Sequence, residues 1–241
     1  RLSRSNRLER RLLDQAEEAW FVNGPIRDWH AAEYPRNADR FHVVSNGFDP
    51  IFLNSAPPRV GGANRSLTFG FLGTIYGPMP LRESLEGWRI ARSESATIAK
   101  SRLVFRGRLG HFAEPDAATA SLLNEYREDG VIHLGPVSKT QVSEVYKDFD
   151  ALLLILGRSK YVTSGKVFEY AATGLPIAAL HDAETAATST LRGHPRLHPV
   201  AKPTPREIAD ALIATAEDAL TTTAEAVERT SGTRFSTARK T

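Results

Sequence analysis

The sequence predicts an α/β protein, with a Rossmann-like doubly wound parallel sheet of about six strands and remnants of a preceding domain. Between residues 66 and 220, short apolar runs alternate with longer amphipathic stretches, which is typical of successive βα units. The run Asp150–Leu156 (DALLLIL) is apolar on both faces, as a central parallel strand is when helices cover both sides. Thr204, Pro205 and Glu207 supply a cap, a first-turn proline and a first-turn acid, so they predict the start of a helix.

The individual elements follow from the same alternation. Strands are expected at residues 67–72, 103–105, 131–134, 151–156, 176–180 and 197–200. Helices are expected at residues 81–100, 117–129, 139–147, 166–173, 184–192 and 205–220. Right-handed crossovers would join these units into one parallel sheet.

The first 65 residues follow another pattern. They predict an Arg-rich amphipathic helix at 1–18, a short strand at 19–22 and a helix at 25–34, and residues 41–45 then lead into a turn. Asn46-Gly47 predicts a turn, and the Pro-, Gly- and Asn-rich stretch that follows predicts a linker. We therefore expect residues 1–45 to be the trailing part of a truncated N-terminal domain, 46–65 a linker, 66–222 the Rossmann-like domain, and 223–241 a basic tail or crossover helix.

Charge and composition exclude several classes of function. The net charge is +3, but residues 1–14 carry +3 and residues 229–241 carry +4, which leaves −4 on the body between them. An acidic body argues against a nucleic-acid partner, because such a partner needs a basic stripe on the folded surface. The chain has no cysteine, so disulfides, zinc ribbons and a thiol nucleophile are excluded and a reducing, cytoplasmic location is expected.

Two features concern the extent of the chain. No apolar run approaches the roughly 20 residues of a membrane-spanning helix. The chain starts at Arg1 and its single methionine is Met79, so we expect a fragment or a processed product.

Ligands of open α/β sheets bind at the carboxyl ends of the strands, and three segments are expected there. Gly70–Gly77 is glycine-rich but does not match G-x-G-x-x-G, so a plain loop remains an alternative. Gly135–Ser138 (GPVS) predicts a rigid turn that could present backbone groups, including those of Val137, to a planar base. The third segment, Thr163–Pro176 (TSGKVFEYAATGLP), is the most informative.

In that segment, Gly165 opens a helix whose N-terminal N–H groups and dipole favour an anion such as a diphosphate. Lys166 adds a positive charge, and Glu169 and Tyr170 are expected on the same helix face. Glu169 would accept hydrogen bonds from a ribose diol. The alternative is a surface ion pair between Glu169 and Lys166.

Other motifs point to no chemistry. A Walker A loop is excluded, because Gly157 and Gly165 lie eight residues apart and Val167 replaces the magnesium-binding Ser or Thr. Asp148 and Asp150 form a D-x-D motif, but they precede their strand, so solvated charges at the end away from the ligand are expected. His194 and His198 have the spacing of a metal pair, but Pro195 argues against a shared helix and predicts a surface loop.

At Ser164–Ile177 (SGKVFEYAATGLPI) the chain resembles the C-terminal domain of GT-B-fold glycosyltransferases, notably the large retaining family 4. Segments 43–49, 71–76, 103–107, 131–135 and 150–154 extend the resemblance, in the family's order and spacing, over about residues 19–220. The resemblance implies the C-terminal half of a GT-B fold that binds a nucleotide-sugar.

The resemblance also implies roles for individual residues. Glu169 corresponds to the second glutamate of the family's E-x7-E motif, which binds the donor ribose. Tyr161 stands where the first glutamate would be, and Thr74 follows Gly73 where the family usually carries Arg and Lys. We therefore hypothesise that Lys166 replaces part of that charge. The resemblance places the other expected donor-binding residues around these: Arg106, Gly135, Val137 and Ser138 near the nucleotide, and Thr163, Ser164 and Gly165 toward the diphosphate or sugar.

The expected function is sugar transfer from a nucleotide-sugar, with retention at the anomeric carbon, to an unknown glycan, lipid-linked or small-molecule acceptor. The catalytic residues are expected on the missing N-terminal domain, so the fragment alone should be inactive. No cofactor and no metal are expected. The basic ends suggest a junction with that domain or a peripheral contact with the inner face of a membrane. A nucleotide-sugar epimerase of the same fold and a non-catalytic nucleotide-binding scaffold remain alternatives.

Overall fold

The computed structural model describes residues 4–54, 65–110 and 115–221, so residues 55–64 of the expected linker and all of the expected basic tail lie outside the described residues. The main body is a parallel sheet of six strands in the order β5-β4-β3-β6-β7-β8, which confirms the predicted fold class. The strands are β3 (Thr68–Leu72), β4 (Arg102–Arg106), β5 (Val131–His133), β6 (Ala151–Leu154), β7 (Ile177–Ala179) and β8 (Leu197–Pro199). The helices are α3 (Leu81–Glu94), α4 (Ala96–Ala99), α5 (Ala117–Glu125), α6 (Val142–Lys147), α7 (Gly165–Thr173), α8 (Ala186–Leu191) and α9 (Pro205–Thr221).

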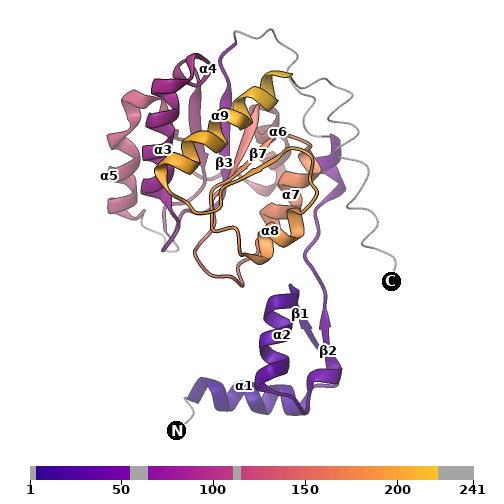
Figure 1. Cartoon of the computed structure of the whole chain (residues 1–241). Coiled ribbons are helices and arrows are strands. Elements are labelled where there is room, and N and C mark those ends of the chain that lie inside the picture. The colour runs from indigo at the N-terminus through magenta and orange to yellow at the C-terminus, as the bar shows by residue number, and fades with distance from the viewer. Residues whose placement is uncertain (1–3, 55–64, 111–114, 222–241) are drawn as a thin grey trace.

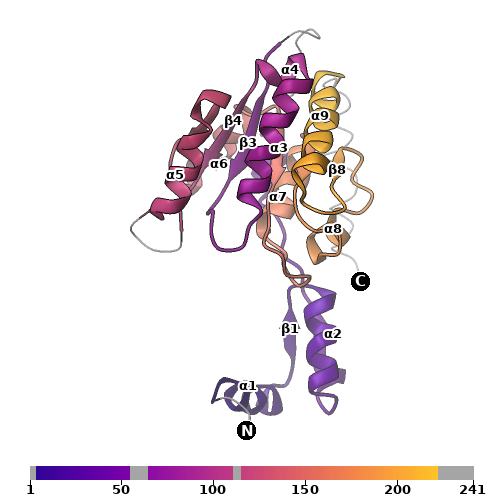
Figure 2. The same cartoon turned by 60° about the vertical axis from the view of Figure 1, so that its left-hand side comes forward.

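Helices cover both faces of the sheet, as Figures 1 and 2 show. Alternate residues of β6 point to opposite faces: Leu153 packs in a core with Trp88 of α3 and Leu212 of α9. Leu152 and Leu154 pack in a second core with residues of α6 and α7. This arrangement is why the sequence of β6 is apolar at every position.

Three expected helices are interrupted. The helix expected at 81–100 is broken at Ser95, whose side chain caps α4 by accepting from the backbone N–H of Ile98. The helices expected at 117–129 and 139–147 each include a 3-10 segment, Arg127–Asp129 (η3) and Lys139–Gln141 (η4). A side-chain cap accompanies the break at Ser95, whereas Tyr126 and Gln141, which precede η3 and α6, make no side-chain cap to these segments.

The N-terminal elements form a small unit below the main body in Figure 1. It contains α1 (Arg4–Gln15), β1 (Ala19–Phe21), α2 (Gly24–Glu33), the 3-10 segment η1 (Ala38–Arg40) and β2 (Phe41–Val43), with β1 and β2 paired in parallel. The expected Asn46-Gly47 turn is wrong: the backbone there has no turn and runs on to a 3-10 helix, η2 (Pro50–Asn54), at the start of the predicted linker.

Two further expectations about polar groups are wrong. Asp150 does precede its strand, but it is only 6% exposed, because Arg65 and the backbone N–H of Thr68 both donate to it at 2.6 and 2.8 Å. His194 is buried rather than in a surface loop, and the Nε2 atom of His198 lies 2.9 Å from a carboxylate oxygen of Asp218. No helix among the described residues is long and apolar enough to cross a membrane.

Candidate functional site

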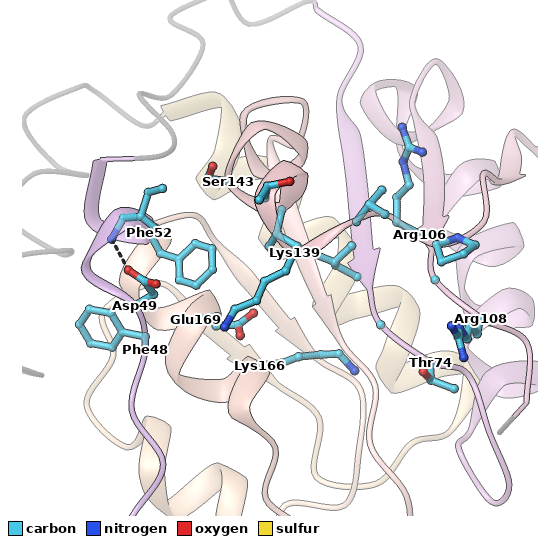
Figure 3. A pocket seen from close by; sticks show the side chains of 18 of the residues that line it. Phe48, Asp49, Phe52, Thr74, Arg106, Arg108, Lys139, Ser143, Lys166 and Glu169 are labelled. Carbon is cyan, nitrogen blue, oxygen red and sulfur yellow. Dashed lines mark hydrogen bonds between the residues drawn. The ribbon is translucent and has the colours of Figure 1, made fainter.

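A cavity of about 710 Å³ lies at the carboxyl ends of β3 and β4, within the size range of small-molecule sites. Its walls come from four parts of the chain: the segment around η2, the loops after β3 and β4, the turn after β5 with η4 and α6, and the first turns of α7. Figure 3 shows Lys166 extending across this cavity toward Thr74 and Arg108, with Phe48, Asp49 and Phe52 on the opposite side.

The backbone at the floor of the cavity allows close approach. Gly73 and Gly107 continue β3 and β4, and the N–H of Gly73 donates to the carbonyl of Arg106 at 2.7 Å. Both glycines have positive φ, +144° and +146°. A Cβ on Gly107 would lie 1.7 Å from the carbonyl oxygen of Gly73, so only glycine fits at position 107.

Gly73 makes room for a side chain of the protein itself. A Cβ on Gly73 would lie 2.1 Å from the Nζ atom of Lys166, and that Nζ lies 5.0 Å from the ring centre of Phe71. Burial lowers the pKa of Lys166, although the nearby carboxylate of Glu169 opposes this shift. Lys166 thus reaches from α7 to Gly73, directly after β3. The hypothesis that Lys166 replaces the charge missing after Gly73 requires this position.

Positive charge dominates the cavity wall. Four lining side chains are basic, Arg106, Arg108, Lys139 and Lys166, and two are acidic, Asp49 and Glu169. Within the described part of the chain, none of the four basic groups forms an ion pair. The alternative surface pair of Glu169 with Lys166 is therefore not formed. A wall with unpaired cations favours an anionic ligand.

The side chain of Glu169 has a hydrogen-bond donor from a neighbouring helix. The hydroxyl of Tyr146, on α6, donates to the Oε2 atom of Glu169 at 3.0 Å. The sequence predicted that Tyr170 shares a helix face with Glu169, and this is wrong. Tyr170 is fully buried, and its hydroxyl accepts from the N–H of Leu72 at 3.0 Å. This bond fixes α7 to the end of β3, so Lys166 and Glu169 are presented to the cavity from a rigid helix.

The predicted donor-binding residues separate into two groups. Those that line the cavity are Gly73, Thr74, Arg106, Val137, Lys166 and Glu169. Those outside its lining are Gly135, Ser138, Tyr161, Thr163, Ser164 and Gly165.

The side chains of the second group are engaged elsewhere or placed beside the cavity. Ser138 caps η4 in a capping box with Gln141. Ser164 caps α7 by accepting from the N–H of Lys166 at 3.3 Å, while a Cβ on Gly165 would meet nothing within 4 Å. The Oγ1 atom of Thr163 is buried and has no hydrogen-bond partner among the described residues. Tyr161 faces α2, since its carbonyl accepts from Asn23 at 3.0 Å.

Several lining residues are missing from the sequence prediction. Arg108 lies two residues beyond Arg106 on the continuation of β4, and this R-G-R pattern after a strand is a signal that could have identified it. Lys139 follows the predicted GPVS turn. Phe48 and Phe52 lie in the predicted linker, and their contact with α6 and α7 bridges about a hundred residues of sequence, so local patterns carry no signal for it.

No group of three or more His, Asp or Glu residues that could hold a metal occurs in the described residues. The absence of a metal requirement stays a prediction.

No family model and no curated protein matches this sequence. Solved structures do match. HepE of Anabaena, in complex with UDP and glucose, superposes with a TM-score of 0.67 at 15% identity, over 97% of this chain and 64% of its own. TarM of S. aureus, solved as a mutant with fondaparinux, alpha-GlcNAc-glycerol and UDP, gives 0.70 at 10% identity, over 98% of this chain and 45% of its own.

WaaG, a glycosyltransferase involved in lipopolysaccharide biosynthesis, gives a TM-score of 0.65 at 16% identity, over 89% of this chain and 58% of its own. These neighbours are GT-B glycosyltransferases, and nearly the whole of this chain superposes on part of their fold. The chain spans less than two thirds of each of these relatives.

Proposed function

We propose that this chain is the donor-binding half of a glycosyltransferase that moves a sugar from a nucleotide-sugar to an acceptor, with retention at the anomeric carbon. The observation that carries the proposal is the cavity at the carboxyl ends of β3 and β4, which is lined by Lys166, Arg108 and Glu169 and whose cations form no ion pair in the described part of the chain. The neighbours add support, because HepE and TarM are both described in complex with UDP.

Each wall of the cavity matches one part of such a donor. Lys166 and Arg108 would bind the diphosphate, and they supply the charge that is missing after Gly73. Glu169 would accept from the ribose hydroxyls. The turn that carries Val137 would contact the base, and Thr74 and the start of α7 would lie toward the sugar.

The positive wall also suits the chemistry. Sugar transfer breaks the bond from the anomeric carbon to a diphosphate oxygen and forms a bond from that carbon to an acceptor hydroxyl oxygen, which loses its proton. Negative charge therefore grows on the departing diphosphate. Preorganised cations placed at that charge lower the barrier.

Catalytic groups toward the acceptor are expected on a preceding domain, so this chain alone is proposed to bind donor without turnover. The small unit of α1, β1, α2 and β2 is the part of that domain proposed to be present here. A cytoplasmic location and a peripheral membrane contact remain predictions. In support of the membrane contact, α1 exposes Leu8 and Leu12, each 60% accessible, among its arginines.

Calorimetry tests the proposal. The chain should bind at least one of UDP, GDP and ADP at micromolar to millimolar concentration, and Glu169→Ala should weaken that binding by about tenfold or more. Glu128→Ala, at an exposed glutamate of η3, is the matched control and should leave the affinity unchanged. A folded chain that binds none of the three nucleotides at millimolar concentration would contradict the proposal.

Product analysis separates transfer from epimerisation once a preceding domain is supplied. Transfer joins the sugar to an acceptor, whereas an epimerase interconverts the free donor. A scaffold would bind the nucleotide and change neither.

A further inference from the structure

The segment that leads from the small N-terminal unit into the main body returns to the wall of the cavity. Phe52, in η2, is 9% exposed and belongs to the core that also contains residues of α6 and α7. Its ring meets the ring of Tyr146 edge-on, with centroids 5.6 Å apart and planes at 87°. In Figure 3, Phe48, Asp49 and Phe52 line the side of the cavity opposite Thr74 and Arg108.

Tyr146 is immobilised on two sides. It is fully buried, and a second edge-on contact with Tyr170 places those two ring centres 5.9 Å apart. Burial raises the pKa of the Tyr146 hydroxyl well above its ordinary value, so the hydroxyl stays protonated. A protonated hydroxyl is a donor, as its hydrogen bond to Glu169 requires.

Glu169 is thereby held in one orientation. Its Oε2 atom accepts from Tyr146, while its side chain lines the cavity next to Lys166. A carboxylate whose rotamer is already fixed loses little conformational entropy when it binds a ligand. A freely rotating glutamate at the same position would bind more weakly.

We infer that Tyr146 and Phe52 are positioning residues: Tyr146 holds the Glu169 carboxylate ready for the ribose hydroxyls, and Phe52 holds Tyr146. This inference rests on the proposed function. On this inference, the segment that contains η2 influences donor affinity through the contact between the rings of Phe52 and Tyr146, although η2 is far from α6 and α7 in the sequence.

The test compares ribonucleotides with their 2′-deoxy analogues. Affinities of UDP, GDP, ADP and the three 2′-deoxynucleotides would be measured by calorimetry for wild type, Tyr146→Phe and Phe52→Leu. Wild type should prefer the ribonucleotide that it binds by about tenfold, because a hydrogen bond to a charged group is lost without the 2′-hydroxyl. Tyr146→Phe should reduce this preference to about threefold or less, and Phe52→Leu should reduce it by a smaller factor.

Tyr126→Phe is the matched control, since Tyr126 is also buried but packs beneath Arg89 in the other core. It should leave the preference unchanged. A general loss of protein stability would weaken the binding of ribonucleotides and 2′-deoxynucleotides equally. The ratio of the two affinities therefore reports the positioning of Glu169 alone. If Tyr146→Phe does not fold, as judged by circular dichroism, Phe52→Leu decides the outcome.

A double-mutant cycle gives the second readout. In a Glu169→Ala background, Tyr146→Phe should have no further effect on the affinity, because its effect passes through the carboxylate. An undiminished effect in that background would overturn the inference. So would an unchanged ratio in the folded single variants, or a wild type that binds nucleotide without preferring ribose. A wild type that binds no nucleotide would overturn the proposed function as well.

Discussion

Charged side chains cluster beside two parts of the sheet, and the two clusters differ in whether their cations form ion pairs. Beside β8, Arg196 is 5% exposed and its guanidinium donates to the carboxylate of Asp218 at 2.8 and 3.0 Å and to the carbonyl of Gly174 at 3.0 Å. At the ends of β3 and β4, Lys166 and Arg108 form no ion pair in the described part of the chain.

This difference indicates that the first cluster stabilises the fold and that the second is available for binding. The cluster around Asp218 completes its own hydrogen bonds, and it ties β8 and the end of α7 to α9. The cavity cations remain available to a ligand, at a cost to stability. The predictions below test whether stability resides in the first cluster and binding in the second.

The largest effect is expected for Asp218→Ala. It leaves the buried Arg196 guanidinium without its carboxylate, which should lower the free energy of unfolding by about 3–5 kcal/mol, measured by urea denaturation. Asp210→Ala on the same helix is the control, because Asp210 pairs with Arg206 at the surface and should cost about 1 kcal/mol or less. Equal losses in the two variants would contradict the structural role of the cluster around Asp218.

A smaller effect concerns pH. Burial lowers the pKa of His194 to about 4, and its Nδ1 atom accepts from the N–H of Arg196, so the folded state keeps this histidine neutral. The unfolded chain takes up its proton near the ordinary value of 6.5, so stability should fall by about 1.4 kcal/mol per pH unit as pH drops from about 6.5 to about 4.

His194→Asn retains an acceptor and removes the titration, so its free energy of unfolding should vary less over this window in urea denaturation at several pH values. Asp218 does not obscure the result. Burial opposes ionisation there, but bonds from His198 and Arg196 prevail and lower its pKa below the ordinary 3.8, so its stabilisation is lost only at lower pH. An identical pH profile in the variant would contradict the assignment.

The smallest effect on stability, with opposite sign, is expected for Lys166→Met. Nucleotide affinity should fall by about tenfold to a hundredfold, because one charge-assisted contact is lost. The free energy of unfolding should rise by about 0.5–1 kcal/mol, since the variant no longer desolvates an unpaired cation. Lys202→Met, at an exposed lysine before α9, should change neither quantity. A variant with unchanged affinity would contradict the role of Lys166.

Much of the fold was predictable from local patterns. All six strands of the main sheet lie within a residue or two of their expected positions, because each βα unit carries its own hydrophobic period. The N-terminal end of α7 was predictable for the same reason, since Ser164 is a favourable N-cap residue directly before an apolar helical period. The break at Ser95 was missed, because a capping serine and an exposed helical serine look alike in sequence.

The site was predictable only where one segment carried the signal. Lys166 and Glu169 belong to a single helix, so their spacing could be read directly. Arg108, Lys139 and Phe52 join them from other elements, and no local pattern links these residues.

The sequence by itself therefore determined the βα alternation, the central position of β6 and the helix that presents Lys166 and Glu169, since all three follow from residues close together in the chain. The tertiary structure decided which charges are paired and which remain open, including the placement of Lys166 over Gly73 and of Phe52 against Tyr146. The physical reason is that these contacts join residues about a hundred positions apart. They depend on β3 lying between β4 and β6 and on helices packing on both faces of the sheet.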